Sequence, residues 1–325
     1  MSVSLSDLPF IDIYVRIDQP DQAYYRSQER EKSTISQLVP PEFQECLGRF
    51  MVAVSQKLAD HNEGAIGFEG LRFRLSRMQF ADGTTWFCAR RINTVIPDIE
   101  KLDLPPLILN HMLGLGKRDG LVIISGSTGQ GKTTTAASLL GYYLRTYGGT
   151  AVTIEDPCEY LMAGRHGEGG QCFQIEVEKD EDWAPCLKRA SRWAPRYIFV
   201  GEIRTPKAAE QVLRAAATGH LVITTMHAGA MEEALMGFIF LAEQSMGSGV
   251  YNMLATALTA LVNQSLKESP PRVKYLFTEE SNAGGDPIRS LIRENKVGLL
   301  STYIDRTEAR LKTAATLQPG GIKKI

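Results

Sequence analysis

The sequence predicts an α/β protein of two domains: a small α+β domain over residues 1–100, and a larger domain with a mainly parallel sheet over residues 101–325. A chain of 325 residues is long enough for two domains of roughly 100 to 200 residues each. From Leu107 onward, short apolar strands alternate with helical stretches, which is typical of a parallel sheet covered by helices. Between the two parts, residues 97–106 carry three prolines without apolar periodicity and predict a linker.

The first domain is expected to contain three strands and one helix. Apolar residues alternate over residues 10–17, which is the period of a half-buried strand. Residues 43–58 place apolar side chains three and four positions apart and predict a helix with one apolar face. Two more strands are expected over residues 71–80 and 86–92, because the turn-forming segment 81–84 separates them.

The second domain is expected to have four buried strands with helices between them. The apolar segments lie at residues 121–124, 151–154, 197–200 and 221–224. They are short and continuous, as strands are when helices cover both faces of a sheet. The remainder of the domain is expected to end in a helical part, with loose segments at residues 279–286 and after Thr313.

Composition restricts the functions that this chain can have. Thirty-six basic and 37 acidic side chains give a formal charge of −1, so a site for a polyanion has to be local. The longest apolar run, residues 235–242, is far shorter than the roughly 20 residues that span a bilayer. No signal peptide is visible, and the five cysteines form no CxxC pair. We therefore expect a cytoplasmic protein with reduced thiols, without a transmembrane segment and without direct binding to nucleic acid.

A glycine-rich segment follows the first strand of the second domain and matches the pattern GxxxxGK[ST] in the strand-turn-helix setting that this pattern requires. Glycines let successive N–H groups point inward, and the start of a helix adds positive potential, so the segment predicts a phosphate site. Lys132 is expected to reach the β- and γ-phosphates of ATP, and the Thr133 hydroxyl to bind Mg²⁺. The expected nucleotide-binding residues are Gly126, Ser127, Thr128, Gly129, Gln130, Gly131, Lys132, Thr133 and Thr134.

Two acidic clusters follow the next strands of the predicted sheet. Residues 151–154 lead into Glu155-Asp156-Pro157-Cys158-Glu159, and residues 198–200 lead into Gly201-Glu202. Functional groups of open α/β sheets gather at the carboxyl ends of the strands. We therefore expect these carboxylates to lie near the phosphate site.

The segments 153–160 (TIEDPCEY), 200–204 (VGEIR) and 218–227, which begins TGHL and ends in His227, resemble the aspartate box, Walker B segment and histidine box of the secretion ATPase superfamily. That superfamily drives type II secretion, type IV pili and related conjugation or secretion machines. The chain is most similar to its PilT-type pilus retraction ATPases, over about residues 71–293. The resemblance implies a RecA-like P-loop ATPase domain preceded by a small PAS-like domain. It also implies a homohexamer that docks on an inner-membrane platform or secretion channel and is peripheral at the inner membrane.

The resemblance also implies roles for individual residues. Glu159 corresponds to the residue that polarises the attacking water, and Glu202 to the one that acts near the Mg²⁺ ion. His220 and His227 correspond to positions near the γ-phosphate and the contact between subunits. Arginines that stabilise the transferred phosphoryl group come from the first domain and its border, or from the ATPase domain. The candidate arginines are Arg72, Arg74, Arg90, Arg91, Arg192 and Arg204.

One departure from the family pattern precedes the Walker B segment. The family often has Arg-x-Asp-Pro-Asp there, whereas this chain has RWAPR at residues 192–196, so Arg196 replaces an acid. A basic residue at this position is similar to the ATPases of Dot/Icm-type secretion and of related conjugation systems. Two other functions stay open from the residues alone: a nucleic-acid-translocating hexameric P-loop motor, and a small-molecule P-loop kinase.

Overall fold

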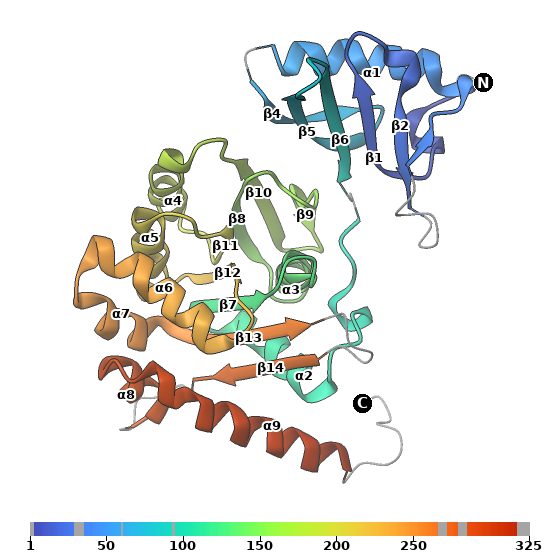
Figure 1. Ribbon diagram of the computed structural model, residues 1–325. Helices are drawn as coiled ribbons and strands as arrows, with labels where there is room; N and C mark the ends of the chain where they lie inside the picture. Colours follow the sequence, from blue (N-terminus) through green and yellow to red (C-terminus); the bar gives the residue numbers. More distant parts are fainter. Residues whose placement is uncertain are drawn as a thin grey trace. The chain divides into compact units, whose positions relative to one another are not determined.

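The computed structural model describes residues 3–28, 36–59, 61–92, 95–265, 272–278 and 285–316 (Figure 1). The chain divides into two compact units. The first comprises residues 1–95 together with 159–161, and the second comprises residues 96–158 together with 162–325. The residues of the predicted loose segments at 279–284 and after 316 lie outside the described residues.

The first unit is one antiparallel sheet covered by one long helix. Along the described part of the chain its elements are β1 (Phe10–Arg16), β2 (Tyr24–Ser27), β3 (Ser36–Leu38), α1 (Gln44–Lys57), β4 (Glu63–Phe68), β5 (Leu71–Gln79) and β6 (Thr85–Ile92). The strand order is β3-β2-β1-β6-β5-β4, so the first strand lies at the centre of the sheet. The predicted α+β character of this part is confirmed.

Helix α1 covers one face of this sheet, and a charged cluster lies on the other. Phe50 of α1 packs against Phe73 of β5 with the ring centroids 4.7 Å apart and the rings tilted, inside the apolar core of the unit. Asp12 points to the opposite face and is fully buried. It accepts hydrogen bonds from Arg26 and, at 2.7 Å, from Arg90 Nε. Two guanidinium groups therefore compensate a buried carboxylate that would otherwise be costly.

The second unit is an eight-stranded sheet with helices on both sides. Its elements are α2 (Pro106–Gly114), β7 (Gly120–Gly126), α3 (Lys132–Tyr147), β8 (Gly149–Glu155), β9 (Gly164–His166), β10 (Gly170–Glu176), α4 (Trp183–Ser191), β11 (Tyr197–Glu202), α5 (Pro206–Ala217), β12 (Leu221–His227), α6 (Met231–Met246), α7 (Gly249–Ala257), β13 (Leu258–Ser265), β14 (Arg272–Phe277), α8 (Pro287–Arg293) and α9 (Ser301–Thr316). The strand order is β14-β13-β7-β12-β11-β8-β10-β9.

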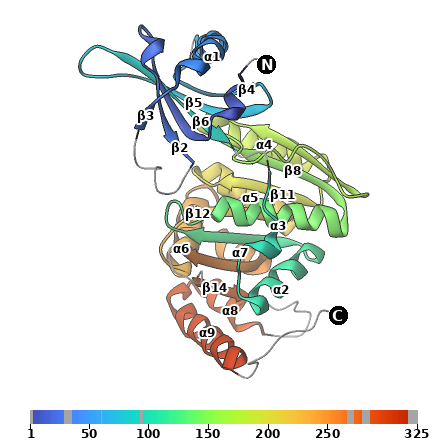
Figure 2. The ribbon, with the colours of Figure 1, turned by 90° about the vertical axis from the view of Figure 1, so that its right-hand side faces the viewer.

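The six central strands of this sheet, from β13 to β10, pair in parallel, and only the edge strands β14 and β9 pair antiparallel. Every residue of β7 is buried, as expected for a strand covered on both faces. Figure 1 shows α3 and the group α4 to α7 on opposite sides of the sheet, and Figure 2 shows α8 and α9 beside β14 at one edge. The predicted mainly parallel α/β fold is confirmed.

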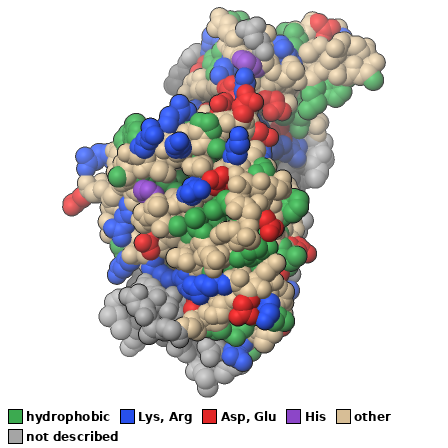
Figure 3. Space-filling view, turned by 90° about the vertical axis from the view of Figure 1, so that its left-hand side faces the viewer, with side chains coloured by type: hydrophobic (Ala, Val, Ile, Leu, Met, Phe, Trp, Pro, Cys, Tyr) green, Lys and Arg blue, Asp and Glu red, His purple; other side chains and the backbone are tan. Residues whose placement is uncertain are grey.

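Basic side chains form groups on one face of the molecule (Figure 3). On the face drawn in Figure 3, Lys and Arg side chains gather in groups instead of spreading evenly. Among the helices of the described residues, none combines the length and the apolar character that crossing a membrane requires.

Three tyrosines attach the first segment of the second unit to the sheet. The hydroxyls of Tyr143 and Tyr147, on α3, donate to the carbonyls of Met112 and Leu113 near the end of α2. Tyr197, at the start of β11, donates to the carbonyl of Gly116 at 3.0 Å. These bonds fix the end of α2 and the segment after it against α3 and β11.

Gly116 permits this contact because it has no side chain. A Cβ atom at this position would lie 2.4 Å from the Tyr143 ring and 2.7 Å from the Tyr147 ring. We expect Gly116→Ala to lower the free energy of unfolding by about 1–3 kcal/mol, because the two rings would have to move. Gly114→Ala is the matched control, since nothing lies within 4 Å of its Cβ position. Thermal unfolding of the two variants measures the difference; equal midpoints would contradict the tyrosine contact.

Candidate active site

The predicted phosphate-binding segment forms a loop between β7 and α3. Gly131 precedes the helix in a left-handed conformation, with φ of 73°. At Gly126 a Cβ atom would lie 2.5 Å from the carbonyl oxygen of Gln264, so the loop approaches β13 more closely than any side chain would allow. Ser127, Thr128 and Gly129 are exposed at the tip of the loop. The backbone is thus curled at the start of a helix, as an anion site requires.

The side chain of Lys132 folds back and forms hydrogen bonds with the backbone of the phosphate loop. Its Nζ donates to the carbonyls of Gly126 at 2.9 Å and Ser127 at 3.0 Å, and the residue is only 6% exposed. The ammonium group is therefore held at the loop by its own backbone, where a bound anion would meet it.

His227, the last residue of β12, lies beside the loop. Its Nδ1 is 3.3 Å from Lys132 Nζ and 3.5 Å from Thr128 Oγ1. Its other ring nitrogen, Nε2, is 3.8 Å from Glu202 Oε2. The structure thus brings together four of the predicted site residues, Thr128, Lys132, Glu202 and His227, because β7, β12 and β11 are neighbours in the sheet.

Arg204 joins the two acidic clusters. One of its guanidinium nitrogens donates to Glu202, and another donates to Asp156 Oδ2 at 2.7 Å. Burial lowers the pKa of Arg204, but the hydrogen bond and charge of Glu202 and those of Asp156 outweigh burial, so its pKa is raised. A planar guanidinium suits two carboxylates at once, because its donors are fixed in a fork. In this structure Arg204 therefore positions the carboxylates.

The two glutamates after β8 have different surroundings. Glu155 is 3% exposed, and its Oε1 accepts from Gln174 Nε2 at 3.3 Å. Glu159 is exposed and belongs to the first unit, together with residues 160 and 161. Only the exposed glutamate presents a carboxylate to solvent, where it could take a proton from water.

The structure does not bring His220 to the loop. His220 precedes β12, whereas His227 ends it, and at about 3.3 Å per residue these two histidines are separated by about 20 Å. His220 Nδ1 lies 2.6 Å from the carbonyl oxygen of Pro195. Its contacts are with the opposite end of the sheet.

The candidate arginines of the first unit lie on two faces of one sheet. Arg74 pairs in register with Arg90, and both are exposed on the face that carries Asp12. Arg72 shares that face, two residues before Arg74 on β5, whereas Arg91 points to the core face and its guanidinium lies 5.9 Å from the centroid of the Phe10 ring. Arg192, in the second unit, is exposed beyond α4.

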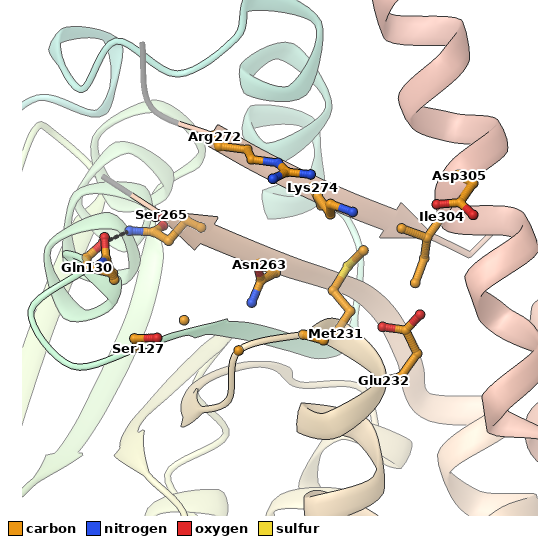
Figure 4. A pocket seen from close by; sticks show the side chains of 14 residues that line it. Ser127, Gln130, Met231, Glu232, Asn263, Ser265, Arg272, Lys274, Ile304 and Asp305 are labelled. Carbon is orange, nitrogen blue, oxygen red and sulfur yellow. Dashed lines mark hydrogen bonds between the residues drawn. The ribbon is translucent and has the colours of Figure 1, made fainter. Parts of the chain in front are cut away.

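Residues of β13 support the loop, and they carry no motif that could have revealed them. Gln264 is buried, and its Nε2 donates to the carbonyl of Gln130 at 2.6 Å (Figure 4). Asn263 Nδ2 donates to Ser125 Oγ at 3.1 Å. No strand is predicted from the sequence at residues 258–265, where β13 lies.

A cavity of about 360 Å³ borders the loop on this side. Ser127 and Gln130 lie at one end of it, and Arg272 and Lys274 project from β14 (Figure 4). Its size is within the range of small-molecule sites. Glu232 and Asp305 also line the cavity, so two cationic and two acidic side chains face it (Figure 4).

Together, these features define a P-loop protein of the α/β class. The sequence matches the family described as type II/IV secretion system protein over residues 63–291. It is 36% identical over 252 residues to the type IV pilus ATPase PilU of Pseudomonas aeruginosa, a match that covers 77% of this chain and 64% of PilU, less than two thirds of that relative's length. The chain belongs to the type II/IV secretion system protein family, which confirms the predicted resemblance.

Solved structures agree with this assignment. The pilus retraction motor PilT with bound ADP superimposes with a TM-score of 0.70 and 27% sequence identity, over 93% of this chain and 87% of that one. The Legionella pneumophila ATPase DotB gives a TM-score of 0.72 at 20% identity, over 93% of this chain and 85% of that one, and supports the fold alone.

The role of Gln264 can be tested without any ligand. We expect Gln264→Leu to leave the buried carbonyl of Gln130 without this donor, at a cost of about 1–3 kcal/mol, so that the loop opens about 5- to 150-fold more often. Hydrogen–deuterium exchange of a peptide covering residues 127–131 measures this opening. Gln244→Leu, at an exposed glutamine of α6, is the control. Unchanged exchange in Gln264→Leu would show that β13 does not hold the loop.

Proposed function

We propose that this chain is a Mg²⁺-dependent ATPase that powers a type IV pilus, a secretion machine or a conjugative transfer machine. The observation that carries the proposal is the buried Lys132 ammonium in a complete P-loop, with Nζ 3.3 Å from His227. Membership of the secretion family supports the proposal, as does the similarity to proteins named as pilus ATPases.

The P-loop would bind the phosphates of ATP. Backbone N–H groups of residues 126–134 and the ammonium of Lys132 supply positive charge from one side. Lys132 now donates to two loop carbonyls. Phosphate oxygens would compete for the same donors, and they bind more strongly because they are charged.

The donors expected for Mg²⁺ fit a hard cation. The Thr133 hydroxyl is half-buried in the first turn of α3, and Glu202 ends β11, so both offer the oxygen atoms that Mg²⁺ prefers. When bound, Mg²⁺ would neutralise charge between the β- and γ-phosphates.

Hydrolysis needs a base for the attacking water. We assign that role to Glu159, whose exposed carboxylate can accept a proton. Glu202 and His227 would orient the groups around the γ-phosphate, and Arg204 would hold Glu202 through its hydrogen bond. His220 would act at a contact between subunits instead of at the phosphate.

Assembly would complete the site. We propose a homohexamer in which arginines of the first unit stabilise the phosphoryl group during transfer, a contribution of about 10³ to 10⁵ in rate for such groups. Arg72 and Arg74 are better candidates than Arg91, because the Arg91 guanidinium lies over Phe10. Motion of one domain against the other would convert hydrolysis into work on an inner-membrane platform or secretion channel, with the protein cytoplasmic and peripheral at that membrane. The native mass in the presence of ATP measures the oligomeric state.

The nucleotide assignment depends on Lys132. We expect Lys132→Ala to weaken ATP binding about 10- to 100-fold and to abolish turnover, because a hydrogen bond to a charged group contributes about 1.5–3 kcal/mol. Lys188→Ala, at an exposed lysine of α4, removes the same charge elsewhere and serves as the control. Equilibrium binding and phosphate release are the measurements. Full turnover by Lys132→Ala would overturn the P-loop assignment.

The two glutamates after β8 can be separated by amide substitution. We expect Glu159→Gln to bind ATP normally and to hydrolyse it about 10²- to 10⁴-fold more slowly, because the amide cannot take the proton. Glu155→Gln should turn over ATP at nearly the original rate, since Glu155 is buried against Gln174. Single-turnover hydrolysis distinguishes them, and the reverse result would move the base to Glu155.

A further inference from the structure

A second cavity lies at the end of the sheet opposite the P-loop. It measures about 740 Å³, within the range of small-molecule sites. It opens where β7, β12 and β13 begin, next to Gly120, Gly219 and Thr259. Because β7 spans seven residues, about 20 Å separate this cavity from the P-loop at the other end of the same strand.

The charged side chains that line this cavity are mainly cationic. Lys117 and Arg118 come from the segment before β7, Arg196 from the residue before β11, and Arg289 from α8. Asp119 is the one acidic residue in the described lining, and Asp286 lies behind Arg289 with its Oδ2 3.6 Å from Arg289 Nε. Four positive charges therefore face two negative ones.

Backbone carbonyls orient the guanidinium groups of these arginines. Arg118 donates to the carbonyl of Thr278 at 2.9 Å, and Arg196 donates to that of Gly116 at 3.0 Å. Arg289 donates to the carbonyls of Ala255 and Thr256 at the end of α7. A carbonyl group carries no net charge, so these bonds orient the guanidinium groups without cancelling their charge, and an anion in the cavity would gain Coulomb energy from the cationic lining.

Crowding of like charge is visible at Arg289. Burial lowers its pKa, and the positive charges of Arg118 and Arg293 lower it further, against the opposing effect of Asp286. An anionic ligand would relieve this repulsion.

The remaining lining favours a small, polar, highly charged ligand. It consists of small or hydroxyl-bearing residues, and within the described lining no large apolar side chain offers a surface for an apolar group: Gly120, Ala216, Ala217, Gly219, Thr256, Ala257 and Thr259. Arginine forks match the oxygens of a phosphate group two at a time. We propose that this cavity binds a small molecule carrying two or more phosphate groups, at a site separate from the P-loop.

The test uses inorganic pyrophosphate as the probe and the full chain as the protein. Pyrophosphate would also enter the P-loop, so binding is measured by calorimetry in the original chain and in Lys132→Ala. We expect binding to persist in Lys132→Ala. In the double variant Lys132→Ala/Arg196→Ala it should weaken at least tenfold, because Arg196 is exposed at the cavity and removing its side chain leaves the core intact. Arg196→Lys keeps the charge without the fork and should give an intermediate affinity.

Lys132→Ala/Arg293→Ala is the matched control, because Arg293 lies on the same helix as Arg289 and does not line the cavity. Its affinity should stay within twofold, and thermal unfolding confirms that each variant is folded. If Arg293→Ala weakened pyrophosphate binding as much as Arg196→Ala, the effect would come from the overall positive potential of the surface and not from contacts in the cavity. That result would overturn the proposed site. Absence of pyrophosphate binding in Lys132→Ala would also overturn it. If hexaglutamate bound instead, in an Arg196-dependent manner, the cavity would be a site for an acidic peptide and the proposal would be wrong.

The proposed nucleotide site at the P-loop and the proposed site in this cavity are tested by different results. Loss of ATP turnover in Lys132→Ala tests the first, and pyrophosphate binding that persists in that variant tests the second. A chain without ATPase activity could still show the second result.

Discussion

Parallel pairing of β7, β12, β11 and β8 is the constraint on which the candidate site depends. Parallel strands end at the same edge of a sheet, so residues about 95 positions apart in sequence meet there. Lys132 follows β7, His227 ends β12, Glu202 ends β11 and Asp156 follows β8, in the order of the strands. The contacts run through the same order, from Lys132 to His227, to Glu202 and, through Arg204, to Asp156. A one-residue change in the register of any of these strands would break that series.

Much of this arrangement could be predicted from the sequence, because its motifs are local. The P-loop, the acidic strand ends and His227 each follow a short apolar strand, and the confirmed α/β fold places strand ends together. The supporting residues could not be predicted in this way. Gln264 holds the loop from β13, a strand that the apolar pattern did not reveal, and its partner is a backbone carbonyl 134 residues away. Contacts of that kind depend on tertiary packing and have no sequence signal of their own.

Strand geometry also explains why two pairs of predicted site residues lie apart: His220 from His227, and Arg90 from Arg91. His220 and His227 share one motif, but they lie at opposite ends of β12, since a strand extends about 3.3 Å per residue. Arg90 and Arg91 are adjacent in β6 and therefore point to opposite faces, one to Asp12 and one to Phe10. The cationic cavity could not be predicted from the composition. A chain with nearly equal numbers of acidic and basic residues still collects four cations around one cavity, because Lys117, Arg118, Arg196 and Arg289 come from three separate segments.

The two tyrosines that hold α2, Tyr143 and Tyr147, have a mechanical consequence. Tension applied to the chain before residue 106 would reach α2 first, and the phenol hydroxyls of Tyr143 and Tyr147 would transmit it to α3 through the carbonyls of Met112 and Leu113. Helix α3 begins at Lys132, so its axis connects this anchor to the phosphate loop. Helix α3 would thus receive the force at its carboxyl end, through Tyr143 and Tyr147, and carry it to Lys132 at its amino end.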